Sequence, residues 1–264
     1  MESNTRYIVR VALIVALGGF LMGFDASVIS GVVTFIEPEF GLSNIELGWA
    51  VASLTLTATL AMMVSGPLSD RFGRRAVLKW AAVLFSVSAV ASALAPDYIT
   101  LVAARMLGGL GVGAALIIAP MYIAEIAPPK LRGSLVSFNQ LNIVIGISVA
   151  YFSNYFLKDL EGESWRWMLG VEALPAIFYF IALFFVPESP RWLIMHGKDE
   201  KALGIMEQVS GREEAEMELA ADKYLSAGAC RRGRDFEWWV GLGGTRPGYK
   251  GPLYKDRDYH LGLY

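Results

Sequence analysis

Six long apolar segments constrain this chain more than any other feature of its sequence. A helix needs roughly 20 mostly apolar residues to cross the hydrocarbon core of a bilayer. Six stretches approach or exceed that length with no more than one charged residue each, and short polar joints separate them: 11–36, 47–69, 80–96, 98–124, 133–157 and 167–187. Buried helices of a soluble protein do not explain six such stretches in a row. The sequence therefore predicts an all-α membrane protein with six transmembrane helices.

Charged residues divide the chain into unlike parts. The first 186 residues contain 23 charged side chains, about 12 %, whereas the remaining 78 residues contain 25, about 32 %. We therefore expect a six-helix transmembrane bundle over 1–187 and a cytoplasmic helical segment over 188–226, with short helices at 190–195 and 199–209 and with Asp199 as an N-cap. Residues 227–264 contain eight Gly and no helical or strand period, which predicts an unstructured tail. A sharper hypothesis is that this tail is read out of frame.

Lysine and arginine in the joints predict the orientation of the bundle. Eleven of them fall on one side of the predicted spans, and only Lys158 and Arg166 fall on the other. Because cytoplasmic loops carry an excess of these residues, the N-terminus and the segment after Pro187 are expected in the cytoplasm. We expect a multi-pass protein of the cell (inner or plasma) membrane whose first helix is retained, since no small-residue cleavage site follows it.

Composition also excludes several classes of function. The net charge of −2 does not favour nucleic-acid binding. The single Cys230 excludes an internal disulfide or a multi-thiolate metal site, and both histidines, His196 and His260, lie outside the apolar part. We find no Ser/His/Asp set and no phosphate-cradling loop, so we expect neither an enzyme nor a bound cofactor.

Three charged residues interrupt the predicted spans and are the first candidates for function. Asp25 lies just past the middle of the first span and Arg105 lies early in the fourth, so the two could meet at similar depth. A charge inside a membrane usually faces a cavity or a partner. The pair could be a proton switch or a static ion pair that fixes helix packing, and we favour the switch. Glu172 could belong to the same pathway or be an interfacial carboxylate.

Two glycine motifs fall within the predicted spans. Gly19 and Gly23 in the first span, and Gly109 and Gly113 in the fourth, place small residues on one helix face. Such spacing lets two helices approach closely. The second motif superficially resembles a nucleotide-binding turn, but no strand precedes it, so helix packing is the favoured interpretation.

All three joints on the predicted cytoplasmic side carry charges of both signs. Asp70 could cap the following helix or pair with a cation there, and the arginines of the first joint could reach carboxylates on the other two. For any one arginine, simple positive-inside anchoring is the plainer interpretation. The sharper hypothesis is a latch that holds this face in one state and releases it in another.

Several motifs, in order, resemble the sugar porter family of the major facilitator superfamily over roughly residues 7–225. They are Gly18 through Asp25 with Ser30-Gly31, Asp70 through Arg75, Arg105 through Gly113, Pro120 through Glu125 with Leu131 to Gly133, Ser137 through Gln140, and Pro187 through Leu193. The similarity is greatest to bacterial sugar/proton symporters, xylose transporters among them. Members of this family have two six-span halves with the substrate site between them.

The resemblance implies a role for particular residues. The symporters have an Asp proton site at the position of Asp25 and its Arg partner at the position of Arg105, whereas similar facilitative carriers have Asn at the first position. A sugar-binding Gln stands at the position of Gln140. The resemblance also implies a cytoplasmic charge latch made of Asp70, Arg74, Arg75, Glu125, Arg132, Glu188 and Arg191.

The chain departs from the xylose transporters near the expected sugar site. Met22 stands where they have Phe, Phe24 where they have Tyr, and Ile147 where they have a second Gln. We place Met22 and Phe24 with Gln140 at the substrate site, while the particular sugar stays open. No second set of six spans follows, so the 264 residues match one half of a family member.

The resemblance implies secondary active transport of a monosaccharide across the bilayer by alternating access, coupled to proton symport. The first alternative is a facilitative sugar carrier of the same fold. The second is a nonfunctional or partner-dependent half-transporter, for which a carboxy-terminal half would be the missing partner.

Overall fold

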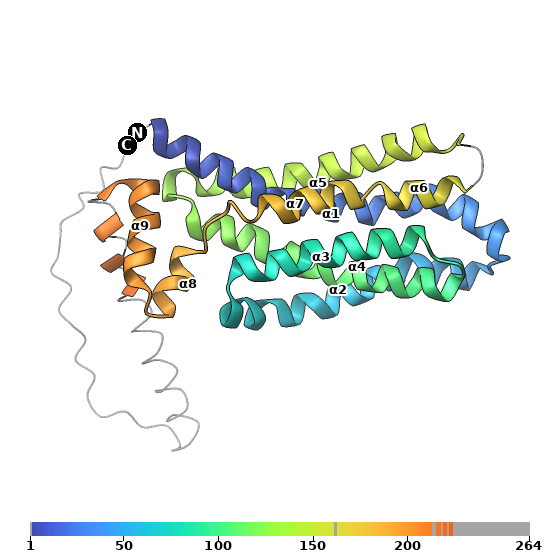
Figure 1. Cartoon of the computed structure of the whole chain (residues 1–264), viewed down its shortest axis with the longest axis horizontal. Helices are drawn as coiled ribbons and strands as arrows, with labels where there is room; N and C mark the ends of the chain where they lie inside the picture. Colours follow the sequence, from blue (N-terminus) through green and yellow to red (C-terminus); the bar gives the residue numbers. More distant parts are fainter. Residues whose placement is uncertain (1, 161–162, 213–214, 218, 221, 224–264) are drawn as a thin grey trace, which may run out of the picture. The chain divides into compact units, whose positions relative to one another are not determined.

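The regular elements of the described residues are all α-helices. The computed structural model describes residues 2–160, 163–212, 215–217, 219–220 and 222–223. The predicted tail at 227–264 lies outside them. Figure 1 shows the long helices running side by side, with two shorter helices at one end.

Five helices are long and apolar enough to cross a membrane. In chain order they are α1 (Glu2–Phe40), α2 (Asn44–Phe72), α3 (Arg74–Ala93), α4 (Tyr98–Ile126) and α5 (Pro129–Leu157). They coincide with the first five predicted spans, although α1, α2 and α4 continue past the apolar stretches and α3 begins earlier. These five predicted spans are confirmed as helices of spanning length.

The sixth predicted span, 167–187, is interrupted in the structure. It contains most of α6 (Ser164–Gly170) and all of α7 (Ala173–Ala182), which lie end to end (Figure 1). Pro175 has no N–H to donate to the carbonyl of Val171, and the N–H of Leu174 bonds to that carbonyl instead, at 3.2 Å. The regular pattern of backbone hydrogen bonds of an α-helix is therefore interrupted at Val171 and Glu172. Neither piece alone has the length of a spanning helix.

Two short helices follow the bundle. They are α8 (Pro190–Met195), as predicted, and α9 (Asp199–Ser210). The prediction of Asp199 as an N-cap is wrong, because Lys198 occupies the cap and Asp199 lies in the first turn. A carboxylate there still faces the positive end of the helix dipole. A small apolar core that includes Trp192 and Met206 joins the two helices.

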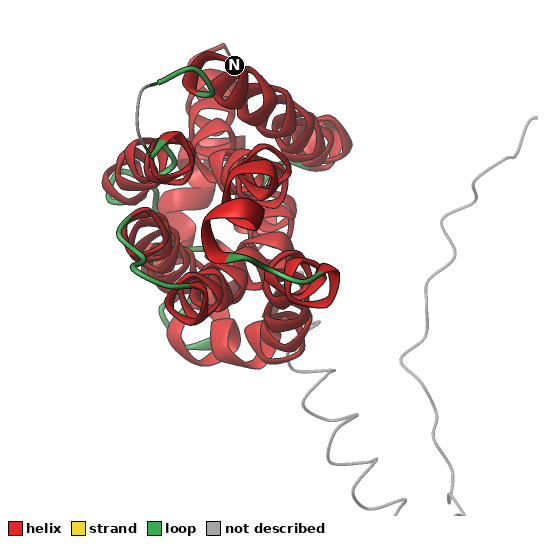
Figure 2. Cartoon of the chain, turned by 90° about the vertical axis from the view of Figure 1, so that its right-hand side faces the viewer, coloured by secondary structure: helices red, strands yellow, loops and turns green. Residues whose placement is uncertain are grey.

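Helices α1 and α4 occupy the centre of the bundle. About 56 % and 61 % of their apolar windows are buried, against 28 % for both α2 and α5. Helix α5 packs along α1, α2 packs along α4, and α3 packs against α4, α6 and α7. Figure 2 shows the bundle along its axis, from the end at which α1 joins α2. Hence α2 and α5 present long apolar faces that no described residue covers.

Glycines let the central helices contact their neighbours at close range, as the two motifs predicted. A side chain at Gly23 would collide with the backbone of Ile143 on α5, and one at Gly113 would collide with the backbone of Ala58 on α2. The close α1–α5 and α2–α4 contacts therefore both depend on glycines, whose lack of a side chain lets the helices approach each other.

Polar residues fix where the helices begin. Ser43 and Glu46 form a reciprocal capping box at the start of α2. At the start of α4, the carboxylate of Asp97 accepts a 2.8 Å hydrogen bond from the N–H of Thr100. That bond lowers the pKa of Asp97 from its usual value, because it stabilises the charged form. Both caps lie at the α1/α2 end of the bundle, so they set the depth at which the functional residues sit.

Candidate functional site

Asp25 on α1 and Arg105 on α4 form an ion pair in the middle of the bundle. Nη1 of Arg105 lies 3.0 Å from Oδ1 of Asp25, and Nη2 donates to the backbone carbonyl of Asp25 at 3.2 Å. Each residue is only 2 % exposed. The structure therefore brings together the two charges that the sequence placed at similar depth. Whether they exchange a proton stays a prediction.

The second carboxylate oxygen of Asp25 is poorly compensated. Among the described residues, no group donates a hydrogen bond to Oδ2. A side chain at Gly108 would touch both this oxygen and the hydroxyl of Ser88, whose proton goes to the carbonyl of Ala104 at 2.8 Å. A buried carboxylate with one free oxygen is an unfavourable arrangement for a purely structural ion pair. The oxygen is in a position to accept a proton.

Glu172, at the break between α6 and α7, is buried within the bundle. It is 3 % exposed, it interacts electrostatically with Asp25 and Arg105, and in the described part of the chain its Oε1 has no hydrogen-bond partner. Its position at the break between α6 and α7 places a second carboxylate near the ion pair. Arg105 forms its ion pair with Asp25, and in the described residues Glu172 forms none with Arg105.

The three residues expected at a sugar site lie in different environments. Gln140 on α5 is exposed, Met22 on α1 is half-buried, and Phe24 is buried in a core cluster with Val28 and Ile29. An amide on an exposed helix face is available to a ligand, whereas Phe24 in this structure acts through packing. Met22 and Phe24 lie on α1 and Gln140 lies on α5, two helices that pack along each other.

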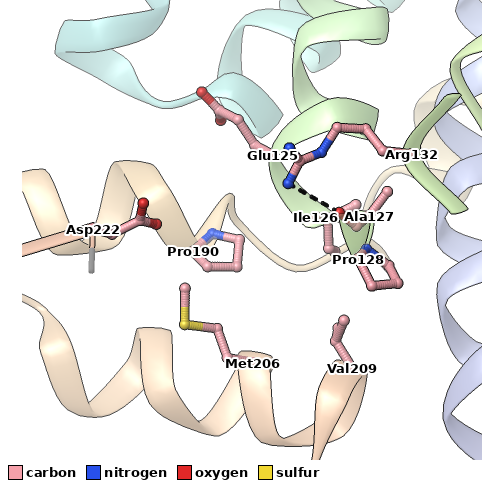
Figure 3. Close-up of a pocket in the computed structure, with 9 residues that line it drawn as sticks. All are labelled: Glu125, Ile126, Ala127, Pro128, Arg132, Pro190, Met206, Val209 and Asp222. Atoms are coloured by element: carbon pink, nitrogen blue, oxygen red, sulfur yellow. Dashed lines mark hydrogen bonds between the residues drawn. The ribbon is translucent and has the colours of Figure 1, made fainter. Parts of the chain in front are cut away.

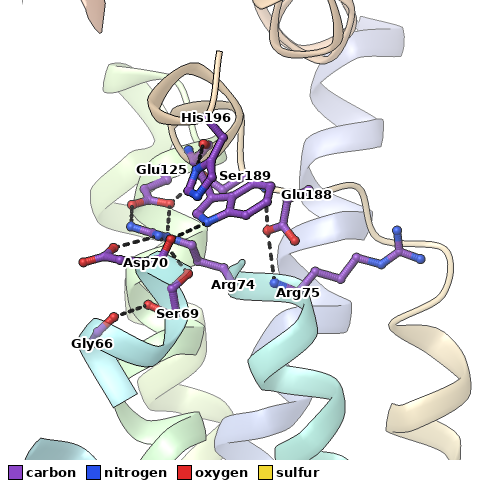
Figure 4. Close-up of polar contacts among 10 residues, drawn as sticks. Gly66, Ser69, Asp70, Arg74, Arg75, Glu125, Glu188, Ser189 and His196 are labelled. Carbon is purple, nitrogen blue, oxygen red and sulfur yellow. Dashed lines mark hydrogen bonds and ion pairs between the residues drawn. The ribbon is translucent and has the colours of Figure 1, made fainter. Parts of the chain in front are cut away.

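We call the end of the bundle where α2 meets α3 the basic end; it consists of residues 70–79, 125–132 and 188–191. Four of its residues form a polar cluster: Asp70, Arg74, Glu125 and Ser189. Arg74 donates from Nε and Nη2 to the two oxygens of Glu125, each at 3.0 Å, and its Nη1 lies 2.8 Å from Asp70 (Figure 4). Ser189 donates its hydroxyl proton to Glu125 at 2.5 Å. A two-pronged guanidinium–carboxylate pair is among the stronger polar contacts in proteins. The cluster links α2, α3 and α4 to the segment before α8.

The side chains of Arg75 and Glu188 do not pair with each other; each forms hydrogen bonds with backbone groups at the end of a helix. Glu188 accepts the backbone N–H of Arg75 at 3.1 Å, at the start of α3. The guanidinium of Arg75 donates to the carbonyls of Leu183 and Phe184 beyond α7, at 3.1 and 2.8 Å. The expectation that the arginines of the first joint reach carboxylates is therefore right for Arg74 and wrong for the side chain of Arg75. The carbonyls left open at the end of a helix attract such a cation.

Arg132 and Arg191 complete the predicted latch set. Arg132 donates weakly to the carbonyl of Ala127, at 3.4 Å, and lines a pocket of about 180 Å³ with Glu125 and Asp222 (Figure 3). Arg191 is exposed on α8. Arg132 thus lies beside Glu125, with no ion pair between the two in the described part of the chain, and both Arg132 and Arg191 are exposed.

Sequence reasoning missed three contributors to the basic end. Ser189 binds Glu125, the indole of Trp192 donates to the carbonyl of Asp70 at 2.8 Å, and the hydroxyl of Tyr122 donates to the carbonyl of Pro187 at 2.8 Å. None of them is charged, so a search for complementary charges could not find them. Their position inside or beside the quoted motifs was the available signal.

These features define a helical, multi-pass membrane protein with an ion pair buried between two spans and a charged cluster at one end. The chain belongs to the sugar (and other) transporter family, whose sequence model matches residues 11–230. It is accordingly a transporter-family protein and not an enzyme.

Known relatives give the same assignment. The chain is 41 % identical over 219 residues to the arabinose-proton symporter of Bacillus subtilis, covering 81 % of this chain and 47 % of that protein. It is 38 % identical over 274 residues to the D-xylose-proton symporter of Escherichia coli, covering 91 % and 56 %. Among solved structures, the major facilitator superfamily proton:xylose symporter bound to 6-bromo-6-deoxy-D-glucose superposes with a TM-score of 0.84 at 37 % identity, over 91 % of this chain and 57 % of that one. The chain thus spans about half the length of the curated relatives it matches.

Proposed function

We propose that this chain supplies one six-helix half of a transporter that couples monosaccharide movement to proton symport by alternating access. The observation that carries the proposal is the buried Asp25–Arg105 pair with its unpartnered carboxylate oxygen. A membrane protein rarely keeps such charges without a use for them. The names of two relatives, an arabinose-proton symporter and a D-xylose-proton symporter, support the same reaction class.

In this proposal Asp25 carries the proton. With Asp25 ionised, Arg105 holds α1 against α4. A proton on Oδ2 removes the negative charge and weakens the ion pair, so α1 and α4 can shift relative to each other. Glu172 then offers Arg105 a second carboxylate, which prevents an isolated cation in the low-dielectric interior. Proton binding is thereby converted into a change of helix contact.

The sugar would bind beside this pair on the α1–α5 contact. Gln140 supplies an exposed amide that can both donate to and accept from sugar hydroxyls. Met22 would supply a flexible apolar surface to the sugar, and Phe24 holds the backbone of α1 in place through the core. A second half would supply further ligands from the opposite side of the site.

The residues of the proposed latch would hold the basic end closed in one state. Arg74, Asp70 and Glu125 form the fixed centre, and Arg75 and Glu188 stabilise the ends of α7 and α3. Arg132 and Arg191, both exposed, would pair with carboxylates of the second half. Separation of the halves at this end would break the outward contacts and leave the centre intact.

The proposal includes the topology predicted from the sequence. Residues 1–187 form six spans, with α6 and α7 together as the sixth, and residues 188–226 form the cytoplasmic helical segment. The basic end faces the cytoplasm of a cell whose inner or plasma membrane holds the protein, because the Lys and Arg excess lies there.

Proteoliposomes test the proposal. The chain is reconstituted with and without a carboxy-terminal half taken from a relative, a pH-sensitive dye is enclosed, and xylose, arabinose or glucose is added outside. We expect sugar-driven acidification of the lumen when both halves are present, and its loss in Asp25→Asn. Glu37→Gln, a change at an exposed carboxylate on α1, is expected to leave the signal intact.

The alternatives give different results in the same experiment. Saturable sugar uptake that ignores the pH gradient would identify a facilitative carrier. Unchanged proton coupling in Asp25→Asn would remove Asp25 from the mechanism. Uptake that appears only with the second half supports the proposed half-transporter, as do the exposed faces of α2 and α5, whereas no uptake in either condition would identify a nonfunctional fragment.

A further inference from the structure

An apolar crevice of about 470 Å³ opens between the end of α3 and the adjoining ends of α6 and α7, and neither Asp25 nor Arg105 lines it. Leu94 forms one wall, and Trp167, Val171 and Leu174 form the other. Figure 1 shows α3 and α6 next to each other at the end opposite α8 and α9. In a membrane-spanning bundle, a crevice with such walls opens toward lipid and not toward an aqueous path.

Two small residues create the crevice. A side chain at Gly170 would meet only the Cβ of Ala93, at 3.2 Å, so α3 and α6 touch there without filling the space beside them. Leu94, Trp167 and Leu174 are all largely exposed around this gap. Tryptophan is enriched where a membrane meets water, which places the mouth of the crevice at the level of lipid headgroups. A volume of this size accommodates much of one acyl chain.

The polar rim of the crevice is built around Arg166. Its Nη1 donates to the carbonyls of Ala93 and Ala95 at 3.2 and 2.5 Å, and its Nε forms an ion pair with Glu163. Glu39 approaches its Nη2 at 3.8 Å. The guanidinium is therefore held in place and already faces two carboxylates.

The charges of this rim favour one kind of headgroup. One cation and two carboxylates give it a net negative charge, and the side chain of Glu163 is 61 % exposed. An anionic lipid would have to displace Glu163 from Arg166 and would then face Glu39. A zwitterionic headgroup can place its cation against Glu163 and its phosphate toward Arg166 without breaking the existing pair.

We propose that the α3–α6 crevice binds one acyl chain of a zwitterionic phospholipid, with the headgroup cation against Glu163. The apolar walls provide the binding free energy, because an acyl chain in the crevice makes more van der Waals contacts with them than it makes in the fluid bilayer. The rim provides the selectivity among headgroups. This site does not depend on the proposed transport reaction.

Native mass spectrometry of the purified 264-residue chain tests the site. The delipidated protein is titrated with an equal mixture of phosphatidylethanolamine and phosphatidylglycerol, and the bound lipids are counted. We expect phosphatidylethanolamine to bind first. Leu174→Trp fills the crevice and is expected to lower this first binding at least fivefold, whereas Ile181→Trp, one heptad further along the same face of α7, is expected to leave it unchanged.

A second pair of variants tests the rim. Glu163→Gln is expected to lower the preference for phosphatidylethanolamine over phosphatidylglycerol roughly fivefold, the effect of one exposed ionic contact. Glu37→Gln changes the net charge equally at an exposed carboxylate that does not line the crevice, and it is expected to keep the preference. Equal binding by Leu174→Trp and Ile181→Trp, or an unchanged preference in Glu163→Gln, would overturn the proposal. Preferential retention of phosphatidylglycerol by the unmodified chain would overturn it as well.

Discussion

Glu125 illustrates, at the scale of single residues, how this chain compensates a buried charge. Its two oxygens accept from both prongs of Arg74 and from the hydroxyl of Ser189. Asp25, by contrast, keeps one oxygen without a described donor. Two carboxylates of the same bundle thus have opposite degrees of hydrogen bonding. The satisfied one suits a fixed contact, and the unsatisfied one suits a change of protonation.

The first prediction concerns the stability of the cluster around Arg74. Arg74 and Glu125 are only 5 % and 7 % exposed, whereas Asp70, which also pairs with Arg74, is 55 % exposed. Glu125→Gln should therefore lower the free energy of unfolding by about 2–3 kcal/mol, because a buried guanidinium loses its main counter-charge. Asp70→Asn should cost about 1 kcal/mol or less. Thermal unfolding in detergent measures both, and equal shifts would contradict the assignment of Glu125 as the centre.

The second prediction concerns pH. The N–H of Thr100 lowers the pKa of Asp97 below its usual 3.8, so the charged cap stabilises the start of α4. This contribution is complete above the unfolded pKa and is lost as the pH falls through the lower folded value. Asp97→Asn keeps a capping side chain at neutral pH but has no carboxyl to titrate. Between pH 2 and 5, the free energy of unfolding should change less with pH in Asp97→Asn than in the unmodified chain. Identical pH dependence in the two proteins would contradict the role of the cap.

At the scale of elements, α3 and the α6–α7 pair are tied to each other at both ends. Arg75 at the start of α3 binds carbonyls just beyond α7, and Arg166 at the start of α6 binds carbonyls at the end of α3. These two antiparallel elements therefore share their terminal hydrogen bonds. We expect them to move as one body, whatever movement the rest of the bundle makes.

The third prediction tests the glycine contact between α1 and α5. Gly23→Ala should destabilise the bundle by about 2 kcal/mol or more, because the new methyl group would meet the backbone of Ile143. Gly48→Ala in α2 meets nothing within 4 Å and should be neutral or slightly stabilising, since Ala favours helix over Gly. The two melting temperatures are compared in the same detergent. A similar effect at both sites would show that close approach of α1 and α5 is not required.

The elements also show where sequence reasoning succeeds. Long apolar runs and paired glycines predicted five helices of spanning length and their close contacts, because both depend on local composition. The same reasoning missed the break at Val171 and Glu172, although Pro175 was visible, since apolar length alone was counted. It predicted the meeting of Asp25 with Arg105, but not the use of carbonyls by Arg75. Acceptors on the backbone have no signature in a sequence.

At the scale of the whole molecule, the long helices differ in how much of their apolar surface is buried. The central helices α1 and α4 are more than half buried, and α2 and α5 are about one quarter buried. The chain also spans about half the length of its relatives. Lipid can cover an apolar face, but a second half can cover it as well and can complete the site beside Gln140.

The fourth prediction follows from this exposure. Residues 1–264 alone should insert into membranes and show helical structure, but should not give saturable sugar uptake. Coexpression with the carboxy-terminal half of a relative should restore uptake, and the two parts should copurify. Phe152→Ser on the exposed face of α5 should weaken copurification more than Phe178→Ser on α7. Robust transport by the chain alone would contradict the proposal of a half.

The bonds that join α3 to the α6–α7 pair have a consequence for how freely this part of the protein can be redesigned. Their acceptors are main-chain oxygens of Ala93, Ala95, Leu183 and Phe184, which every substitution at those positions retains. The two donors, Arg75 and Arg166, have to be kept, and the buried side chains of Ala95 and Leu183 have to keep their packing. An engineer can therefore exchange the exposed side chain at Phe184 to adjust hydrophobic thickness, while the joint itself persists.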